Sequence, residues 1–118
     1  MKNTVTAVLR VGTFGIFLGH GVYAFRQRPD WVEYLTSVGF SADTALSLMP
    51  VIGIVDFVVA VAVLVWTWRP AIIYAAIWAF LTASVRVWVG EEVWEFVERS
   101  GNWATPLALF LLLRERRG

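Results

Sequence analysis

The chain has 118 residues, of which 58% are apolar and only 16% are charged, and its mean hydropathy is +0.66. A soluble domain is usually about 45–50% apolar and about 25% charged, and a chain this short has too little interior to hide the surplus. These figures exclude a disordered chain and a large multidomain enzyme, and they favour a single integral membrane domain over residues 1–118.

The charge and the residue counts exclude further functions. Ten basic residues face nine acidic ones, and a net charge of +1 is not the footprint of a nucleic-acid-binding protein. Without Cys, this chain alone has no disulfide, thiol relay or iron–sulfur cluster. Haem and metal are disfavoured, since His20 is the only His and Met49 the only available second axial ligand. No motif for a catalytic site is present, so an enzymatic activity of its own stays undecided.

Four stretches along the chain are apolar enough to be read as membrane spans. A span needs about 20 residues, because the hydrocarbon core is about 30 Å thick and a helix rises about 1.5 Å per residue. We predict helices over residues 4–25, 44–68, 71–90 and 100–114, the last being short and completed by flanking polar residues. The pattern predicts an all-α fold, a transmembrane four-helix bundle.

The connections after the first and third spans are polar but keep apolar residues at helical spacing. These residues are Trp31, Tyr34, Leu35 and Val38 in the first connection, and Val93, Trp94, Phe96 and Val97 in the second. Each set predicts a short helix that lies in the membrane interface. We expect Gly101 to break the second helix and Pro70 to begin the third span. Ser41 or Asp43 could cap the second span.

Four spans would place both chain termini on one side of the membrane. Basic residues on that side are Lys2, Arg10, Arg69, Arg114, Arg116 and Arg117, and those on the other side are Arg26, Arg28, Arg86 and Arg99. Because basic residues are in excess on cytoplasmic segments, this bias places both termini in the cytoplasm of a cell membrane.

Small residues form stripes on three of the predicted spans. The stripes are Gly12, Gly15 and Gly19 in the first span, Gly53 and Ala60 around Asp56 in the second, and Ala75, Ala79 and Ala83 before Arg86 in the third. Since small side chains let membrane helices approach closely, we expect the helices to pack through these faces. Asp56 and Arg86 would then face the bundle and avoid the lipid.

Polar residues gather toward the outer side of this arrangement. From the length of the spans, His20 and Arg86 lie about 6–8 Å inside the outer boundary, and Asp56 lies near the midplane. Four more approach the same level from the fourth span and the segment before it: Glu95, Glu98, Arg99 and Asn102. Together these seven residues predict a ligand pocket near the outer leaflet.

Each of these residues also has a purely structural interpretation. Arg86 could reach the headgroups or pair with Glu95 or Glu98, and His20 could hydrogen-bond a neighbouring helix. Asp56 could be a neutral packing residue, since a buried charge needs a proton, a partner or water. The acidic residues before the fourth span could form a solvated face.

In the functional interpretation, the same residues serve a bound molecule. His20 exchanges a proton near neutral pH, Arg86 holds a carbonyl or an anionic headgroup, and Asp56 carries a proton inward. We expect three aromatic residues to flank a flat ring: Phe17, Tyr23 and Trp88. These roles suit a quinone-like or lipid-like ligand.

Three motifs resemble those of DoxX-like membrane proteins. They are Gly15-Ile-Phe-Leu-Gly-His-Gly21, Pro50-x-x-Gly53-x-x-Asp56 and Glu98-Arg-Ser-Gly-Asn-Trp-Ala-Thr-Pro-Leu107, and the resemblance covers residues 8–113. It implies a four-helix bundle and a small subunit linked to terminal quinol oxidase and thiosulfate:quinone oxidoreductase activity. The functional positions it implies are His20, Asp56, Arg86, Glu98 and Asn102. Because the chain has no Cys, a redox role would depend on a bound cofactor or on a partner subunit.

From the sequence we predict a small, redox-associated integral membrane subunit with a pocket for a quinone-like or lipid-like ligand. One alternative is a structural or accessory subunit of a larger membrane complex or homo-oligomer, without chemistry of its own. Another is a small-molecule or proton permeation pathway that uses Asp56. The cofactor is unknown, with quinone as the candidate, and the first partner is the lipid bilayer.

Overall fold

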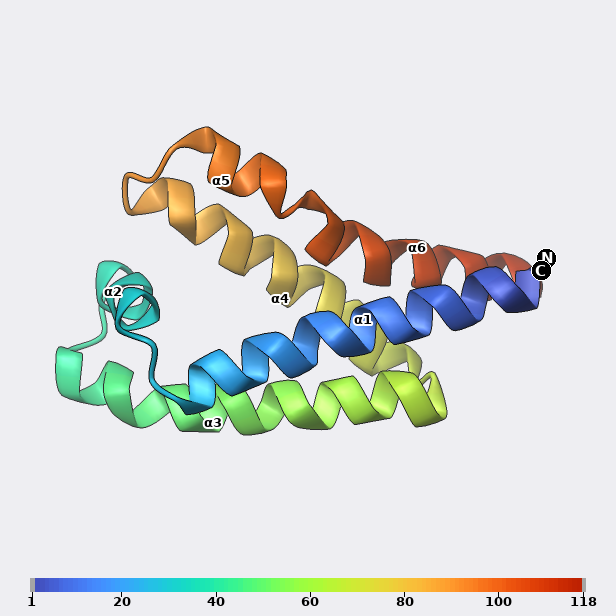
Figure 1. The fold of residues 1–118 in the computed structure, drawn as a ribbon, viewed down its shortest axis with the longest axis horizontal. Helices are drawn as coiled ribbons and strands as arrows, with labels where there is room; N and C mark the ends of the chain where they lie inside the picture. Colours follow the sequence, from blue (N-terminus) through green and yellow to red (C-terminus); the bar gives the residue numbers. More distant parts are fainter. Residues whose placement is uncertain (1, 118) are drawn as a thin grey trace.

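The computed structural model describes residues 2–117, which fold into helices joined by short turns (Figure 1). In chain order these are α1 (Lys2–Phe25), α2 (Pro29–Ser37), α3 (Ala42–Val61), the π-helix η1 (Ala62–Trp66), α4 (Arg69–Trp88), α5 (Val93–Glu98) and α6 (Ser100–Arg117). Three segments are long and apolar enough to cross a membrane: Asn3–Phe25, Ala42–Trp66 and Arg69–Trp88. The all-α prediction is confirmed, and these segments match the first three predicted spans to within two residues at each end.

Helix α6 forms where the fourth span was predicted. Within the described chain it is not among the helices that are long and apolar enough to cross a membrane, because charged residues follow Leu113. The fourth span therefore stays a prediction. The side chains of Lys2, Arg116 and Arg117, which entered the prediction of sidedness, lie outside the described part of the structure.

The helices form two antiparallel pairs, α1 with α3 and α4 with α6. Helix α1 also contacts α6, whereas α3 makes few contacts with α4. Figure 1 shows that the pairs converge toward the end of the molecule where α1 begins and α6 ends, and diverge toward α2. We call these two parts the core end and the cavity end.

The core end contains the main cluster of buried apolar side chains. Phe17, Val63, Ile72 and Leu109 are fully buried there, and two of the alanines predicted to form the small face of α4, Ala75 and Ala79, pack among them. Two arginines also join helices to one another. Arg10 donates to the Leu64 carbonyl oxygen in the π-helix, and Arg69 donates to that of Leu113 at 3.0 Å. The first of these bonds supplies a partner to a carbonyl at the end of the π-helix, where intrahelical donors run out.

The predicted packing of α1 through Gly15 and Gly19 is wrong, since a Cβ on either would meet nothing within 4 Å. The buried face of α1 instead runs through Thr13, Phe17 and Gly21. Residues two positions apart point about 200° away from each other around a helix, so Gly15 and Gly19 lie on the opposite face.

Helices α1 and α3 make their closest approach at Gly21 and Gly53. A Cβ added to Gly53 would lie 2.8 Å from the Gly21 carbonyl oxygen and 2.9 Å from the Phe25 amide nitrogen. Of the predicted glycine stripe, only Gly12 has a neighbour, with Thr105 at 3.4 Å from an added Cβ. Gly53 could therefore not be replaced without moving the two backbones apart, and a Cβ on Gly21 would displace the Phe57 ring.

The predicted connections are confirmed as helices α2 and α5. Ser41 caps α3, with its hydroxyl oxygen accepting from the Thr44 amide at 3.2 Å. Pro70 lies in the first turn of α4, after a reversal at Thr67, whose φ is +50°. The break predicted at Gly101 is wrong: α5 ends at Glu98, and a tight turn at Arg99 lets α6 restart at Ser100, so Gly101 is helical.

Candidate functional site

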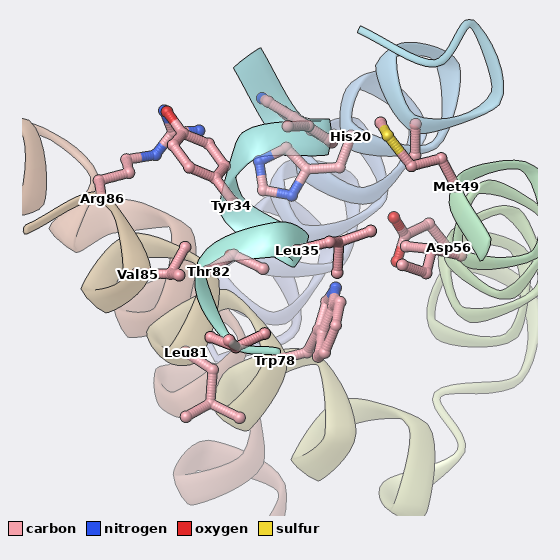
Figure 2. Close-up of a pocket in the computed structure, with 14 residues that line it drawn as sticks. His20, Tyr34, Leu35, Met49, Asp56, Trp78, Leu81, Thr82, Val85 and Arg86 are labelled. Atoms are coloured by element: carbon pink, nitrogen blue, oxygen red, sulfur yellow. The ribbon is translucent and has the colours of Figure 1, made fainter. Parts of the chain in front are cut away.

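A cavity of about 330 Å³ lies at the cavity end, between the diverging helix pairs and beneath α2. Its walls come from α1, α2, α3 and α4, and most of the lining side chains are apolar (Figure 2). They include Ala24, Leu35, Val38, Met49, Ile52, Leu81 and Val85. At the core end the helices pack against one another around the buried apolar cluster, whereas at the cavity end the two pairs diverge around the cavity.

Three of the ionisable residues predicted from the sequence line this cavity: His20, Asp56 and Arg86. Each comes from a different long helix, α1, α3 or α4. Asp56 follows Gly53 by three residues and so lies close to the contact between α1 and α3. Arg86 follows the buried alanines of α4. Figure 2 shows Arg86 on one side of the cavity, Asp56 on the other and His20 between them.

Asp56 is the most completely buried of the three, at 1% exposed. Both of its carboxylate oxygens are buried and have no hydrogen-bond partner among the described residues. A carboxyl group in this situation is costly unless a proton, water or ligand compensates it. Asp56 is therefore the side chain at this site that most needs an external partner.

Arg86 is 8% exposed and is held by Tyr34 of α2. Its Nη1 donates to the Tyr34 hydroxyl at 2.7 Å, and its guanidinium carbon lies 5.0 Å from the centre of the Tyr34 ring. Its Nε is buried without a partner in the described structure. Burial, followed by a hydrogen bond with Glu91, raises the pKa of Tyr34 to about 12, so its hydroxyl stays protonated at neutral pH. Arg86 forms no ion pair with Glu95 or Glu98 in the described structure, since both glutamates pair with Arg99, so this predicted pairing is wrong.

His20 makes ring contacts rather than hydrogen bonds within the described residues. Its ring centre lies 5.5 Å from that of Trp31 in an edge-to-face arrangement and 6.0 Å from that of Phe17. The structural interpretation in which His20 hydrogen-bonds a neighbouring helix therefore finds no support. Its nitrogens remain available to water or to a molecule in the cavity.

The aromatic residues of the cavity differ from those predicted to flank a ring. Phe17 is fully buried in the core cluster, and Tyr23 does not line the cavity but packs against Trp31. Trp88 is 72% exposed and donates to the Ser37 carbonyl oxygen at 3.3 Å. Three other aromatics line the cavity: Trp31, Tyr34 and Trp78. Because α2 covers the cavity and brings Trp31 and Tyr34, span order alone could not identify them.

The other predicted site residues do not line the cavity. Arg99 is paired with Glu95 at 2.8 Å and with Glu98 at 3.2 Å, on α5 and at its end. Asn102 lies in the first turn of α6, and its backbone amide donates to the Arg99 carbonyl oxygen. Estimates of depth placed these four residues at the level of Arg86, but α5 runs on the far side of α4 (Figure 1).

Helix α2 is fixed over the cavity by three polar contacts. Besides the contact of Arg86 with Tyr34, Trp88 of α4 bonds to Ser37, and Gln27, just before α2, donates to the Leu46 carbonyl oxygen at 2.8 Å. These bonds join α2 to both α3 and α4. The amphipathic spacing of α2 in the sequence predicted a surface helix but not the cavity it covers.

These features define a helical protein with three candidate membrane spans and an apolar cavity that carries ionisable groups on opposite sides. Comparisons with protein-family models, curated proteins and solved structures found no match to this chain. In the described residues, no cluster of three His, Cys, Asp or Glu side chains could hold a metal ion. His20 and Met49, the axial pair considered for haem, both line the cavity.

Proposed function

We propose that this chain is a small integral membrane subunit that binds a flat, lipophilic, quinone-like molecule in the cavity beneath α2. The observation that carries the proposal is the combination of an apolar, aromatic lining with buried, incompletely bonded Asp56 and Arg86. Pockets that bind small molecules are mostly apolar and fix their ligands by a few convergent polar groups. A redox-associated role, as the DoxX-like motifs imply, would then come from the bound molecule or from a partner subunit.

The size and lining of the cavity suit a ring-shaped headgroup. Its volume of about 330 Å³ lies at the lower end of the range of about 300–1,000 Å³ for ligand pockets. Trp31 and Trp78 offer aromatic faces, and Arg86 offers donors for a carbonyl oxygen. A longer apolar tail would extend from the cavity among the aliphatic side chains and the lipid.

The proposal includes a fourth span in α6, interfacial positions for α2 and α5, and termini in the cytoplasm. The start of α1 and the end of α6 lie at the same end of the molecule in Figure 1, which supports an even number of crossings. Exposed tryptophans support the proposed positions of the membrane interfaces. Trp66 and Trp68 lie at the turn between η1 and α4, and Trp88 and Trp94 lie at the opposite end. Tryptophans are enriched at both membrane interfaces.

A matched pair of variants on α4 tests the proposed site. Thr82 and Ser84 both bond back to helix carbonyls, but only Thr82 lines the cavity. Purified protein in nanodiscs is titrated with a short-chain ubiquinone, and tryptophan fluorescence and thermal unfolding are followed. We expect saturable quenching and stabilisation, by about 2.7 kcal/mol at a concentration of 100 Kd. Thr82→Phe should abolish both effects, and Ser84→Phe should leave them intact.

A specific result would contradict the proposal. If the quinone quenches and stabilises the wild type and the Thr82→Phe variant alike, it does not bind in this cavity. Mass spectrometry of the natively purified protein adds a second test, since a copurifying quinone should be lost in His20→Ala and Arg86→Ala.

A second candidate function is that of an accessory subunit, favoured by the exposed glycines of α1. Gly15 and Gly19 present a surface with nothing within 4 Å of an added Cβ, which is the kind of face that receives a neighbouring membrane helix. Native mass spectrometry of the wild type and of Gly15→Leu tests this. A larger assembly lost in the variant would support it, and a monomer in both would contradict it.

A further inference from the structure

The two sides of the cavity offer opposite hydrogen-bonding groups. The Arg86 guanidinium presents only donors, whereas Asp56 presents two oxygens that have no hydrogen-bond partner in the described structure. The two residues do not form an ion pair with each other in the described chain, and Figure 2 shows them on opposite sides of the cavity. A molecule between them could form the missing hydrogen bonds of both residues.

From this arrangement, and resting on the proposed function, we infer that the cavity selects ligands with a hydroxyl group at the Asp56 side and an acceptor oxygen at the Arg86 side. The ligand class is a flat aromatic alcohol, of which the reduced (quinol) form of a quinone ring is one example. Its all-carbonyl form would be the weaker ligand.

The preference follows from what each state of Asp56 can do. An ionised carboxylate has only acceptors, so it accepts a hydrogen bond from a ligand hydroxyl and repels a carbonyl oxygen. A protonated Asp56 still keeps an acceptor oxygen, so it accommodates a hydroxyl as well. A ligand with acceptors alone can use only the protonated state, and otherwise leaves a buried carboxylate without a partner.

The arrangement of the other groups limits the alternatives. Tyr34 already occupies Nη1 of Arg86, so the remaining guanidinium donors, including the buried Nε, are left for the ligand. His20 can donate or accept a hydrogen bond, so it does not change the preference for a hydroxyl at the Asp56 side and an acceptor at the Arg86 side. Asp56 is therefore the residue that distinguishes a hydroxyl from an ether or a carbonyl.

The experiment compares 1-naphthol with 1-methoxynaphthalene, which keeps the ring and the oxygen but loses the donor. Each probe is equilibrated with protein-containing nanodiscs and with empty nanodiscs of the same lipid, and the difference in bound probe is quantified by chromatography. We expect the wild type to bind the naphthol about tenfold more tightly, the ratio expected for one missing hydrogen bond to a buried group.

The same comparison is made with Asp56→Asn, which replaces one oxygen by a donor of the same size, and with the exposed Asp43→Asn as a control. We expect the ratio to fall below about threefold in Asp56→Asn and to stay near tenfold in Asp43→Asn. The wild-type ratio alone keeps the test decisive if Asp56→Asn fails to fold.

The outcomes separate the two proposals. Equal binding of the two probes by the wild type, or a ratio that Asp56→Asn leaves unchanged, would overturn the inferred selectivity while leaving a cavity that binds flat molecules. Absence of any Thr82→Phe-sensitive binding of either probe would overturn the proposed function itself.

Discussion

At the core end, Phe17, Ile72 and Leu109 are fully buried against one another, and Arg10 and Arg69 bond to carbonyls of other helices. At the cavity end, the helix pairs diverge, and Asp56 is just as buried but has no partner in the described structure. If the proposed function holds, the core end supplies stability and the cavity end supplies binding. A protein keeps a costly, unpartnered group where function needs it and compensates elsewhere.

The largest effect should come from removing packing at the core end. Ile72→Ala should lower the free energy of unfolding by about 2–4 kcal/mol, because a fully buried side chain leaves a void that close-packed helices cannot fill. Ile52→Ala, on the cavity wall, should cost less than about 1 kcal/mol, since it only enlarges an existing space. Equilibrium unfolding in mixed micelles measures both. Equal losses would contradict the division between the two ends.

The next largest effect should come from the contact between α1 and α3. Gly53→Ala should destabilise the protein by about 1–3 kcal/mol, because its Cβ would press on the backbone of Gly21 and Phe25. Gly19→Ala should be neutral or stabilise the protein by up to about 1 kcal/mol, since its Cβ meets open space and alanine favours the helix. The same unfolding measurement applies. A greater loss in Gly19→Ala would show that α1 packs through the stripe predicted from the sequence.

Replacing a polar side chain at each end should change stability in opposite directions. Asp56→Leu should stabilise the ligand-free protein by about 1–2 kcal/mol, because it removes an unpartnered polar group, and should abolish ligand binding. Arg10→Met should destabilise it by about 1 kcal/mol, because the Leu64 carbonyl loses its donor. Thermal unfolding without ligand compares the two variants. A destabilised Asp56→Leu would mean that Asp56 serves the fold.

The smallest effect concerns alkaline pH at the cavity end. The pKa of Tyr34 is about 12 in the folded chain against 10.0 unfolded. The folded state therefore holds this proton more tightly, and the contribution to stability is present below pH 10 and is lost as pH rises toward about 12. Since Tyr34 is partly exposed, the loss should stay under about 1 kcal/mol. Tyr34→Phe should lack this component in unfolding curves between those pH values, and an identical slope in both proteins would contradict the assignment.

Much of the fold could be predicted from the sequence because spans, caps and turns are local. Apolar length located three spans, and the residue types at Ser41 and Pro70 located helix starts. The choice of packing face could not be predicted, because Gly15–Gly19 and Thr13–Gly21 are both plausible stripes until α3 selects one. The π-helix at the end of α3 also left no signal in composition.

The site could be predicted in part for a similar reason. Polar residues within apolar spans are conspicuous, which identified His20, Asp56 and Arg86, all of which line the cavity. Tyr34 and Trp31 were missed as site residues because their role depends on how α2 folds back over the long helices. Trp78 had one signal, its place in the middle of a span rather than at an end.

The central claim, that the cavity end binds a flat lipophilic molecule, is tested most directly by photoaffinity labelling. A photoreactive naphthoquinone is activated in nanodiscs containing the protein, and the modified residues are identified by mass spectrometry of peptides. We predict labels on α2 and α4 at residues lining the cavity, such as Leu35, Trp78 and Leu81, that disappear with excess unlabelled ligand or in Thr82→Phe. Labels confined to outward residues such as Val8 and Val58, unaffected by competition, would contradict the account.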